Sequence, residues 1–183
     1  MKRILVADIM IPMSHCMTVQ EDHSLLDVFQ ALDQTRNSKN EALHKDSIVL
    51  DRNGAFLGKI TMIDIFMALE PNYSRVKQLH ETASRHSVGA YMKMAEDFDL
   101  WLEPTQTIRH RAGQLKVANV MHIPEEIEYI DEQENLEKAM HIYIMGVHQP
   151  LIVIDADNEV TGVLRFGDIF EAFRQSLLDP NSP

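Results

Sequence analysis

The chain has 183 residues, of which 45% are hydrophobic and 25% charged, the balance of an ordinary globular protein. Its formal charge of −11 gives no long-range attraction to nucleic acid or to an anionic membrane surface, so we expect neither as a partner. The single cysteine, Cys16, excludes an intramolecular disulfide and a zinc site made of several thiolates. No stretch approaches the ~20 apolar residues of a membrane span. We therefore expect a cytoplasmic protein.

The two halves of the chain repeat each other. Residues 47–66 align with 151–170 without a gap, and residues 6–10 align with 117–121 at a larger offset. The difference in offset places extra residues in the polar stretch 35–46, which we interpret as a longer exposed loop in the first copy. Because a half-length domain buries its core inefficiently, the two copies are expected to share an interface.

Each copy is expected to begin with the same elements. A short helical turn and a proline, Pro12 or Pro124, come first, and an extended piece follows at 18–20 or 129–131. A helix comes next, because apolar residues recur at three- and four-residue steps. These residues are Leu25, Val28, Phe29 and Leu32 in the first copy, and Leu136, Ala139, Met140 and Tyr143 in the second.

Two short strands and a second helix complete each copy. The turn residues 52–54 join strands at 48–51 and 55–60, and residues 156–158 join strands at 151–155 and 159–164. The last helix starts near Asp64 or Asp168. We expect it to bury Ile65, Phe66 and Leu69 in the first copy, and Ile169, Phe170, Phe173 and Leu177 in the second.

The segment between the copies breaks the pattern and is too long for a plain turn. A helix is favoured there by the apolar stripe Tyr91, Met94, Ala95, Phe98 and Leu102, and more weakly by Val76, Leu79 and Ala83. Glu103 and Pro104 are expected to end this helix. We therefore divide the chain into a first repeat at 1–70, a helical connector at 71–113 and a second repeat at 114–179.

One motif closes both copies: glycine, two residues, a hydroxyl residue, two residues and aspartate. It is complete at 58–64, and at 162–168 Arg165 replaces the hydroxyl residue. Together with the duplication and the order strand, helix, strand, strand, helix, this motif resembles the tandem CBS-domain pair, or Bateman module. The resemblance covers nearly all of the chain except the connector. It implies an α/β (α+β) fold, in which two CBS repeats form a pseudo-twofold module.

The residue types of the motif suit a nucleotide. A carboxylate at a helix start, Asp64 or Asp168, can accept two hydrogen bonds from the vicinal hydroxyls of a ribose. Thr61 can donate its hydroxyl to a phosphate oxygen, beside the free N–H groups of the following helix. The guanidinium of Arg165 can contact two phosphate oxygens, which would favour a more highly phosphorylated ligand in the second site. The plainer alternative, that both aspartates only cap helices, stays open.

The resemblance also implies where an adenine would lie, in the cleft between the repeats. Apolar residues would hold the base: Ile11 and Pro12 with Ile48 in the first copy, and Ile123 and Pro124 with Leu151 in the second. Backbone groups would contact the adenine edge around Lys45 and Asp46, and around His148 and Gln149.

Other chemistry has less support. The nearest groupings among the nine histidines are His15 with Cys16 and His23, His80 with His86, and His141 with His148. None has the spacing of a metal motif, so no metal site is predicted.

The acidic runs 125–128 and 131–134 are expected to be solvated ahead of a helix. The basic cluster 109–111 either reaches a ligand phosphate or forms a solvated loop. No catalytic motif is present.

We therefore expect a stand-alone, non-catalytic sensor that binds AMP, ADP or ATP, with or without Mg²⁺, and requires no cofactor. As such modules generally do, it would form a homodimer, and it would signal to a separate partner protein. Two alternatives stay open: S-adenosylmethionine as the ligand, and a ligand-free interaction scaffold with decayed sites. A small hydrolase or metal-dependent enzyme has no constellation of residues behind it.

Overall fold

The computed structural model describes residues 4–37, 46–73, 93, 96–97, 100 and 103–178. The first half contains α1 (Val6–Ile9), β1 (Ile11–Pro12), η1 (Met13–His15), β2 (Met17–Gln20), α2 (Leu25–Asn37), β3 (Ser47–Leu50), β4 (Phe56–Ile60) and α3 (Met62–Leu69). The second half contains α6 (Thr105–Gln114), η2 (Val117–Asn119), η3 (Glu126–Glu128), β5 (Tyr129–Asp131), α7 (Leu136–Ile144), β6 (Leu151–Ile154), β7 (Val160–Leu164) and α8 (Phe166–Leu178). The predicted order of elements is confirmed in both copies.

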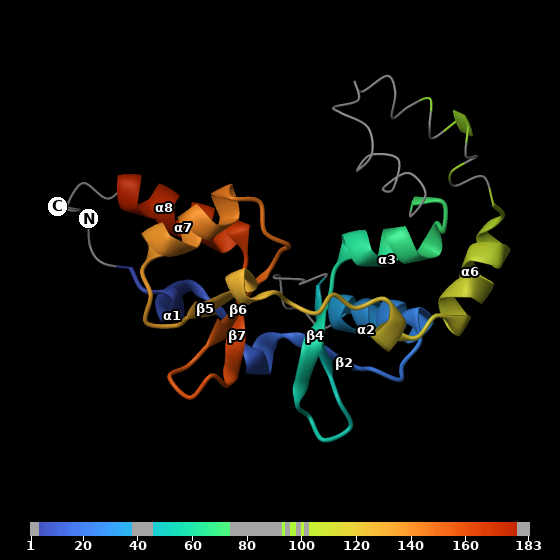
Figure 1. Ribbon diagram of the computed structural model, residues 1–183, viewed down its shortest axis with the longest axis horizontal. Coiled ribbons are helices and arrows are strands. Elements are labelled where there is room, and N and C mark those ends of the chain that lie inside the picture. The colour runs from blue at the N-terminus through green and yellow to red at the C-terminus, as the bar shows by residue number, and fades with distance from the viewer. Residues whose placement is uncertain are drawn as a thin grey trace.

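The strands form two sheets, one in each of two lobes that lie side by side (Figure 1). The first lobe contains the sheet β2-β3-β4 with α2, α3 and α6, and the second contains the sheet β1-β7-β6-β5 with α1, α7 and α8. In each lobe a parallel pair, β2 with β3 or β5 with β6, continues into an antiparallel hairpin. The hairpin register shifts at the same place in both copies, after Val49 and after Val153.

The two copies exchange their first segments. Val6 of α1 is buried in the core of the second lobe, and β1 pairs with β7, where Pro12 lies opposite Gly162. In the other direction, Val117 is buried in the core of the first lobe, and His122 forms a bridge with Lys59 on β4. Neither lobe is therefore built from one sequence copy alone, and neither is complete without the other.

Glycines at the crossing points make this exchange possible. A Cβ atom at Gly58 would lie 2.6 Å from the carbonyl oxygen of His122, and one at Gly162 would lie still closer to the carbonyl oxygen of Ile11. Real Cβ atoms do not approach a backbone oxygen so closely. The glycine of each closing motif therefore serves the backbone crossing between the copies, where no side chain fits.

The last helices bury a narrower face than the sequence predicts. Ile65 and Leu69 of α3 and Ile169 of α8 are buried as expected. Three residues of these helices that were expected in the core are instead substantially exposed: Phe66 (54%), Phe170 (60%) and Leu177 (66%). Phe29 of α2, also expected in the core, is 39% exposed. Phe66 and Phe170 each follow a buried isoleucine by one residue, about 100° further around the helix, so they lie away from the sheet.

The connector is described only in part. Its predicted apolar stripe (Tyr91, Met94, Ala95, Phe98 and Leu102, with Val76, Leu79 and Ala83) lies outside the described residues. Pro104 precedes α6 as its N-cap. The basic cluster 109–111 lies on α6, which corrects the expectation of a loop. The Arg111 guanidinium donates to the carbonyl of Leu69 at the end of α3 and to Glu103 (2.5 Å), so it satisfies a helix terminus. No helix in the described ranges is long and apolar enough to cross a membrane.

Candidate functional site

A narrow crevice lies where the two lobes meet. Its lining comes from both copies: Cys16, Asp46, Ser47, Ile48, Lys59, Pro150, Val163 and Arg165. The cavity volume is about 10 Å³, which is room for about one water molecule. A pocket for a small molecule usually holds several hundred Å³ or more, so this crevice is closed to a nucleotide in the present arrangement of the lobes.

The first closing motif is a capping box. Thr61 is the N-cap of α3, and its hydroxyl and amide both donate to Oδ2 of Asp64, at 2.7 and 2.8 Å. Nε2 of His148, from the other lobe, lies 3.1 Å from Oδ1 of the same carboxylate. Both oxygens of Asp64 therefore have partners within the protein, as the capping alternative expects, and a ribose would have to replace or share them.

The second closing motif is an ion pair. Arg165 donates from Nε to Oδ2 of Asp168 (2.7 Å) and from Nη2 to Oδ1 (2.5 Å). The two side chains are 32% and 22% exposed, so the pair is open to solvent on one side. The guanidinium also acts on the crevice, because its charge opposes the rise in pKa that burial causes at Asp46 and at Cys16. Arg165 thus lines the crevice, while its guanidinium donates two hydrogen bonds to the carboxylate of Asp168.

The residues expected around the base are placed unevenly. Ile11 and Ile48 pack in one apolar cluster between the lobes, and this cluster also contains Ile152. Leu151 is fully buried in the core of the second lobe. The structure does not place Leu151 in the crevice, because neighbouring residues of a strand face opposite sides and Ile152 has the position that corresponds to Ile48.

The remaining expected contacts differ in exposure. Pro12 on β1 is exposed, Ile123 is 67% exposed, and Pro124 is buried. Asp46 lines the crevice, and Gln149, which is exposed, precedes Pro150 through a cis peptide bond. Lys45 lies outside the described residues.

A buried lysine that we did not predict lies at the junction of the lobes. The side chain of Lys59 is 0% exposed, and its ammonium donates to Oε2 of Glu128 (2.6 Å) and to the carbonyls of His148 (2.5 Å) and Pro150 (2.6 Å). Three acceptors match the three N–H groups of the ammonium. The carbonyl of His148, expected to contact adenine, is therefore already occupied. One signal was present: Lys59 interrupts an apolar strand at the position where the second copy has Val163.

The acidic partner of this lysine is buried as well. Glu128 is 3% exposed, which corrects the expectation of solvation for this residue, while Glu125 and Glu126 of the same run are exposed as expected. Burial alone would raise the pKa of Glu128, but hydrogen bonds from Lys59 and His122 hold that pKa below its ordinary value. Burial lowers the pKa of Lys59, and its pairing with Glu128 opposes that effect. This ion pair therefore joins β4 of the first lobe to η3, just before β5 of the second.

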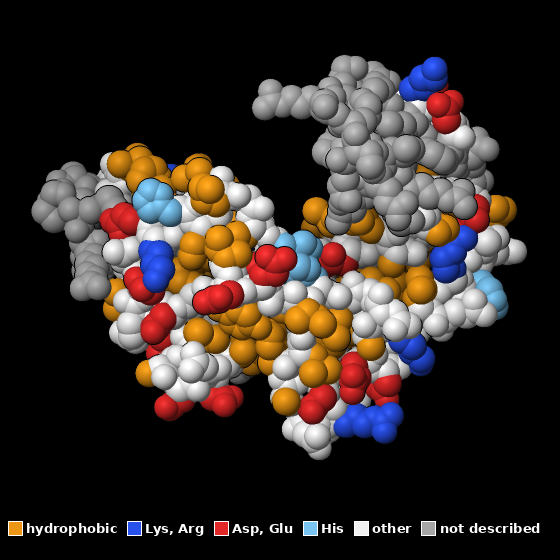
Figure 2. Space-filling model, in the orientation of Figure 1, with side chains coloured by type: hydrophobic (Ala, Val, Ile, Leu, Met, Phe, Trp, Pro, Cys, Tyr) orange, Lys and Arg blue, Asp and Glu red, His pale blue; other side chains and the backbone are white. Residues whose placement is uncertain are grey.

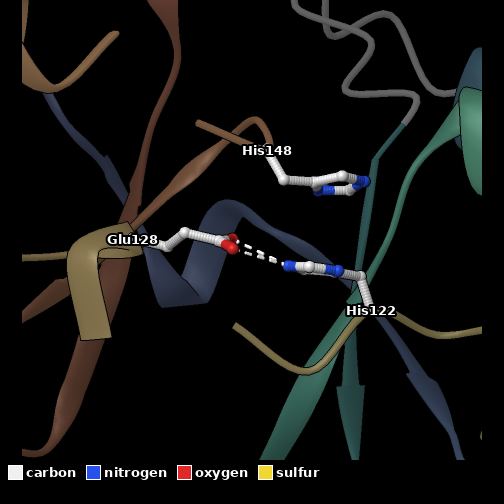
Figure 3. Close-up of side chains that lie close together, drawn as sticks. All are labelled: His122, Glu128 and His148. Atoms are coloured by element: carbon white, nitrogen blue, oxygen red, sulfur yellow. Dashed lines mark hydrogen bonds and ion pairs between the residues drawn. The ribbon is translucent and has the colours of Figure 1, made fainter. Parts of the chain in front are cut away.

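Two histidines extend the network (Figure 3). Nε2 of His122 lies 2.7 and 3.0 Å from the two carboxylate oxygens of Glu128. The ring of His148 stacks on the ring of His122, with centroids 4.0 Å apart and planes 17° apart. Donor atoms of His122, Glu128 and His148 all lie within 4.8 Å of one another. Figure 2 shows histidine and acidic side chains gathered where the two lobes meet.

Solved structures share this architecture. CBSX2 of Arabidopsis thaliana, solved in complex with AMP, is 18% identical with a TM-score of 0.59, over 93% of this chain and 97% of that chain. A CBS domain-containing protein from Bacillus anthracis is 20% identical with a TM-score of 0.59, over 94% of each chain. The CBS domain of a bacterial CNNM/CorC family Mg²⁺ transporter, in complex with ATP, is 15% identical with a TM-score of 0.54, over 91% and 84%. At these identities the likeness shows the fold. No curated protein gave a significant match.

The family follows from the sequence itself. A family model for the CBS domain matches the chain twice, at residues 6–71 and 117–175, which together make up more than half of its length. The two matches contain the two closing motifs and flank the connector. The two lobes form the paired arrangement of a Bateman module. The chain therefore belongs to the CBS-domain family, as a tandem CBS pair.

Proposed function

We propose that this CBS pair is a non-catalytic regulatory module that binds AMP, ADP or ATP between its lobes. The observation that carries the proposal is the second closing motif: the guanidinium of Arg165, suited to phosphate, lines the crevice and holds the carboxylate of Asp168, which is suited to a ribose. The complexes of CBSX2 with AMP and of the Mg²⁺ transporter CBS domain with ATP support the choice of ligand.

The ion pair of the second motif offers a route for binding. A nucleotide phosphate would take over the guanidinium of Arg165, and the freed carboxylate of Asp168 would accept the ribose hydroxyls. Both groups keep charged or polar partners during this exchange. Because the pair is partly exposed, solvent screens its charges more than those of the buried pair of Lys59 and Glu128, and it is the easier of the two to separate. The second site is therefore the one we expect to bind first.

Binding would also require the lobes to separate, since the crevice holds about 10 Å³. A ligand that fits only the opened arrangement would shift the population toward it, and this shift is the signal that a partner protein could detect.

A homodimer in the cytoplasm is part of the proposal. Exposed apolar side chains on the last helices suit such an interface: Met62, Ile63 and Phe66 on α3, and Phe166, Phe170, Leu177 and Leu178 on α8.

Calorimetry tests the proposal. AMP, ADP and ATP, each with and without Mg²⁺, and S-adenosylmethionine are titrated into the full chain and into the double variant Asp64→Asn/Asp168→Asn. We expect an adenine nucleotide to bind the wild type with a Kd below about 1 mM, or at least about 4 kcal/mol of binding free energy, and the double variant to lose it. Binding of S-adenosylmethionine alone would replace the ligand class, and binding of none of them would overturn the proposal.

One observation favours a second candidate, a ligand-free interaction scaffold. Both motif aspartates are engaged by protein side chains, and the crevice between the lobes is closed. In that case the first motif links the lobes through Asp64 and His148, and neither motif binds a ligand. The absence of heat with every ligand above, from a chain that still forms a dimer in solution, would support this reading.

A further inference from the structure

We propose that His122, Glu128 and His148 form a binding site for a divalent transition-metal cation, with Zn²⁺ as the reference ion, at the junction of the lobes. This site shares Asp64 and His148 with the proposed nucleotide site, but metal binding does not depend on nucleotide binding. Its three donors are two imidazole nitrogens and one carboxylate, a ligand set that binds zinc in proteins and leaves a fourth position for water.

The candidate donor atoms already lie close together. His122 and His148 stack face to face, and His122 points its Nε2 at Glu128 (Figure 3). All three donor atoms lie within 4.8 Å of one another, whereas two ligands of one zinc ion lie about 3–4 Å apart because each bond is about 2.0–2.2 Å long. A modest splaying of the two rings would therefore close the site around a cation.

His148 has the hydrogen-bond pattern of a metal-binding histidine. Its Nε2 lies 3.1 Å from Oδ1 of Asp64. An ionised carboxylate only accepts hydrogen bonds, so in the neutral ring the proton is on Nε2 and the lone pair is on Nδ1. That Nδ1 atom is buried and has no hydrogen-bond partner among the described residues. Histidines that bind metals usually donate their other ring N–H to a carboxylate, as His148 does to Asp64.

Glu128 is held in the same way. Lys59 donates to Oε2 at 2.6 Å and fixes the carboxylate, while Oε1 faces His122. The ammonium would repel a cation, and the carboxylates of Asp46, Asp64 and Glu128, which all act on Lys59, oppose that repulsion.

Binding requires a proton to move. At present Nε2 of His122 donates its N–H to the carboxylate of Glu128, which only accepts. A cation bound to Nε2 requires the neutral ring to carry its proton on Nδ1 instead. The cation would then stand between His122 and Glu128, where the hydrogen bond is now. Because His122 is bonded through its backbone to Lys59 of β4, and His148 precedes β6, the cation would link the two lobes.

The test is zinc binding by the full chain without nucleotide. Zn²⁺ is titrated calorimetrically into the wild type and into His122→Gln, His148→Gln and Asp64→Asn, with His141→Gln, an exposed histidine of α7, as the matched control. We expect the two histidine variants to lose at least ~100-fold in affinity, Asp64→Asn to lose ~10-fold, and His141→Gln to bind as the wild type.

A second measurement needs no variant. Zn²⁺ should shift the ring proton resonances of His122 and His148 in the wild-type NMR spectrum, and Co²⁺ should give the intense visible bands of a four-coordinate ion. Zinc binding that persists unchanged in both histidine variants would overturn the proposal. So would a wild type that binds neither Zn²⁺ nor Co²⁺ at millimolar concentration.

Discussion

The two closing motifs occupy matching places in the two lobes, yet their aspartates are held differently. Asp64 accepts hydrogen bonds from Thr61 of its own lobe and contacts His148 of the other lobe. Asp168 is paired with Arg165 of its own motif, in a partly exposed ion pair. Duplication kept the spacing of the motif, while the partners of the two carboxylates diverged. One motif therefore ties the lobes together, and in the proposed function the other exchanges its partner for a ligand.

The same asymmetry appears one residue after each motif glycine. Lys59 reaches across the junction to three acceptors, whereas Val163 packs in the apolar cluster between the lobes. The first copy therefore supplies the polar link of the interface, and the second supplies apolar surface. The predictions below probe this difference.

The largest effect is expected at the buried lysine. Replacing it in Lys59→Met leaves Glu128 buried with its charge uncompensated, which should cost about 3–5 kcal/mol of unfolding free energy. Urea unfolding in the presence of a chelator measures this. The double variant Lys59→Met/Glu128→Gln removes both charges and should recover most of the loss. A loss below about 1 kcal/mol in the single variant would mean that the pair contributes little to the junction.

The crossing glycines should come next. Gly162→Ala and Gly58→Ala force a Cβ against a backbone carbonyl and should each lower the unfolding free energy by about 1–3 kcal/mol, with Gly162 the more sensitive. Gly113→Ala is the matched control, since its Cβ would meet nothing within 4 Å on helix α6, and it should stabilise slightly. Equal effects at Gly162 and Gly113 would contradict the close crossing of β1 over β7.

The alkylation rate of the Cys16 thiol reports on whether the crevice is closed, and measuring it requires no destabilising substitution. Burial raises the pKa of its thiol to about 11, with Arg165 opposing the rise. Alkylation by iodoacetamide at pH 8 should therefore be roughly 100-fold slower in the native chain than in urea, and it should accelerate as the pH approaches 11. Arg165→Met should slow it further. A native rate equal to the unfolded rate would show that the crevice is open.

The sequence predicted the elements and their order because each element is set by local periodicity, turn residues and the repeat. The stripe of Leu136 and Ala139 and the hairpin turn at 156–158 are examples. The exchange of first segments could not be predicted from the sequence, because the pairing of Ile11 with Val163 joins residues far apart in the chain. Exposure of Phe66 and Phe170 was missed for a related reason: a helix with apolar residues on two faces does not show which face the sheet covers.

The sequence indicated candidate site residues only where residue type carries the chemistry, and their contact with a ligand stays a prediction. Asp64, Asp168, Thr61 and Arg165 lie in the two closing motifs, on facing lobes. The network of Lys59, Glu128 and His122 was missed because its members come from separate segments and meet only in the folded pair. Leu151 was misplaced by a single residue, and in a strand one residue reverses the face.

The most direct test of the asymmetry is calorimetric titration of ATP into the single variants Asp64→Asn and Asp168→Asn of the full chain. The second motif has the exchangeable ion pair, so Asp168→Asn should weaken binding at least ~10-fold, or about 1.4 kcal/mol, while Asp64→Asn should weaken it less. Abolition of binding by Asp64→Asn, with Asp168→Asn unchanged, would contradict the account.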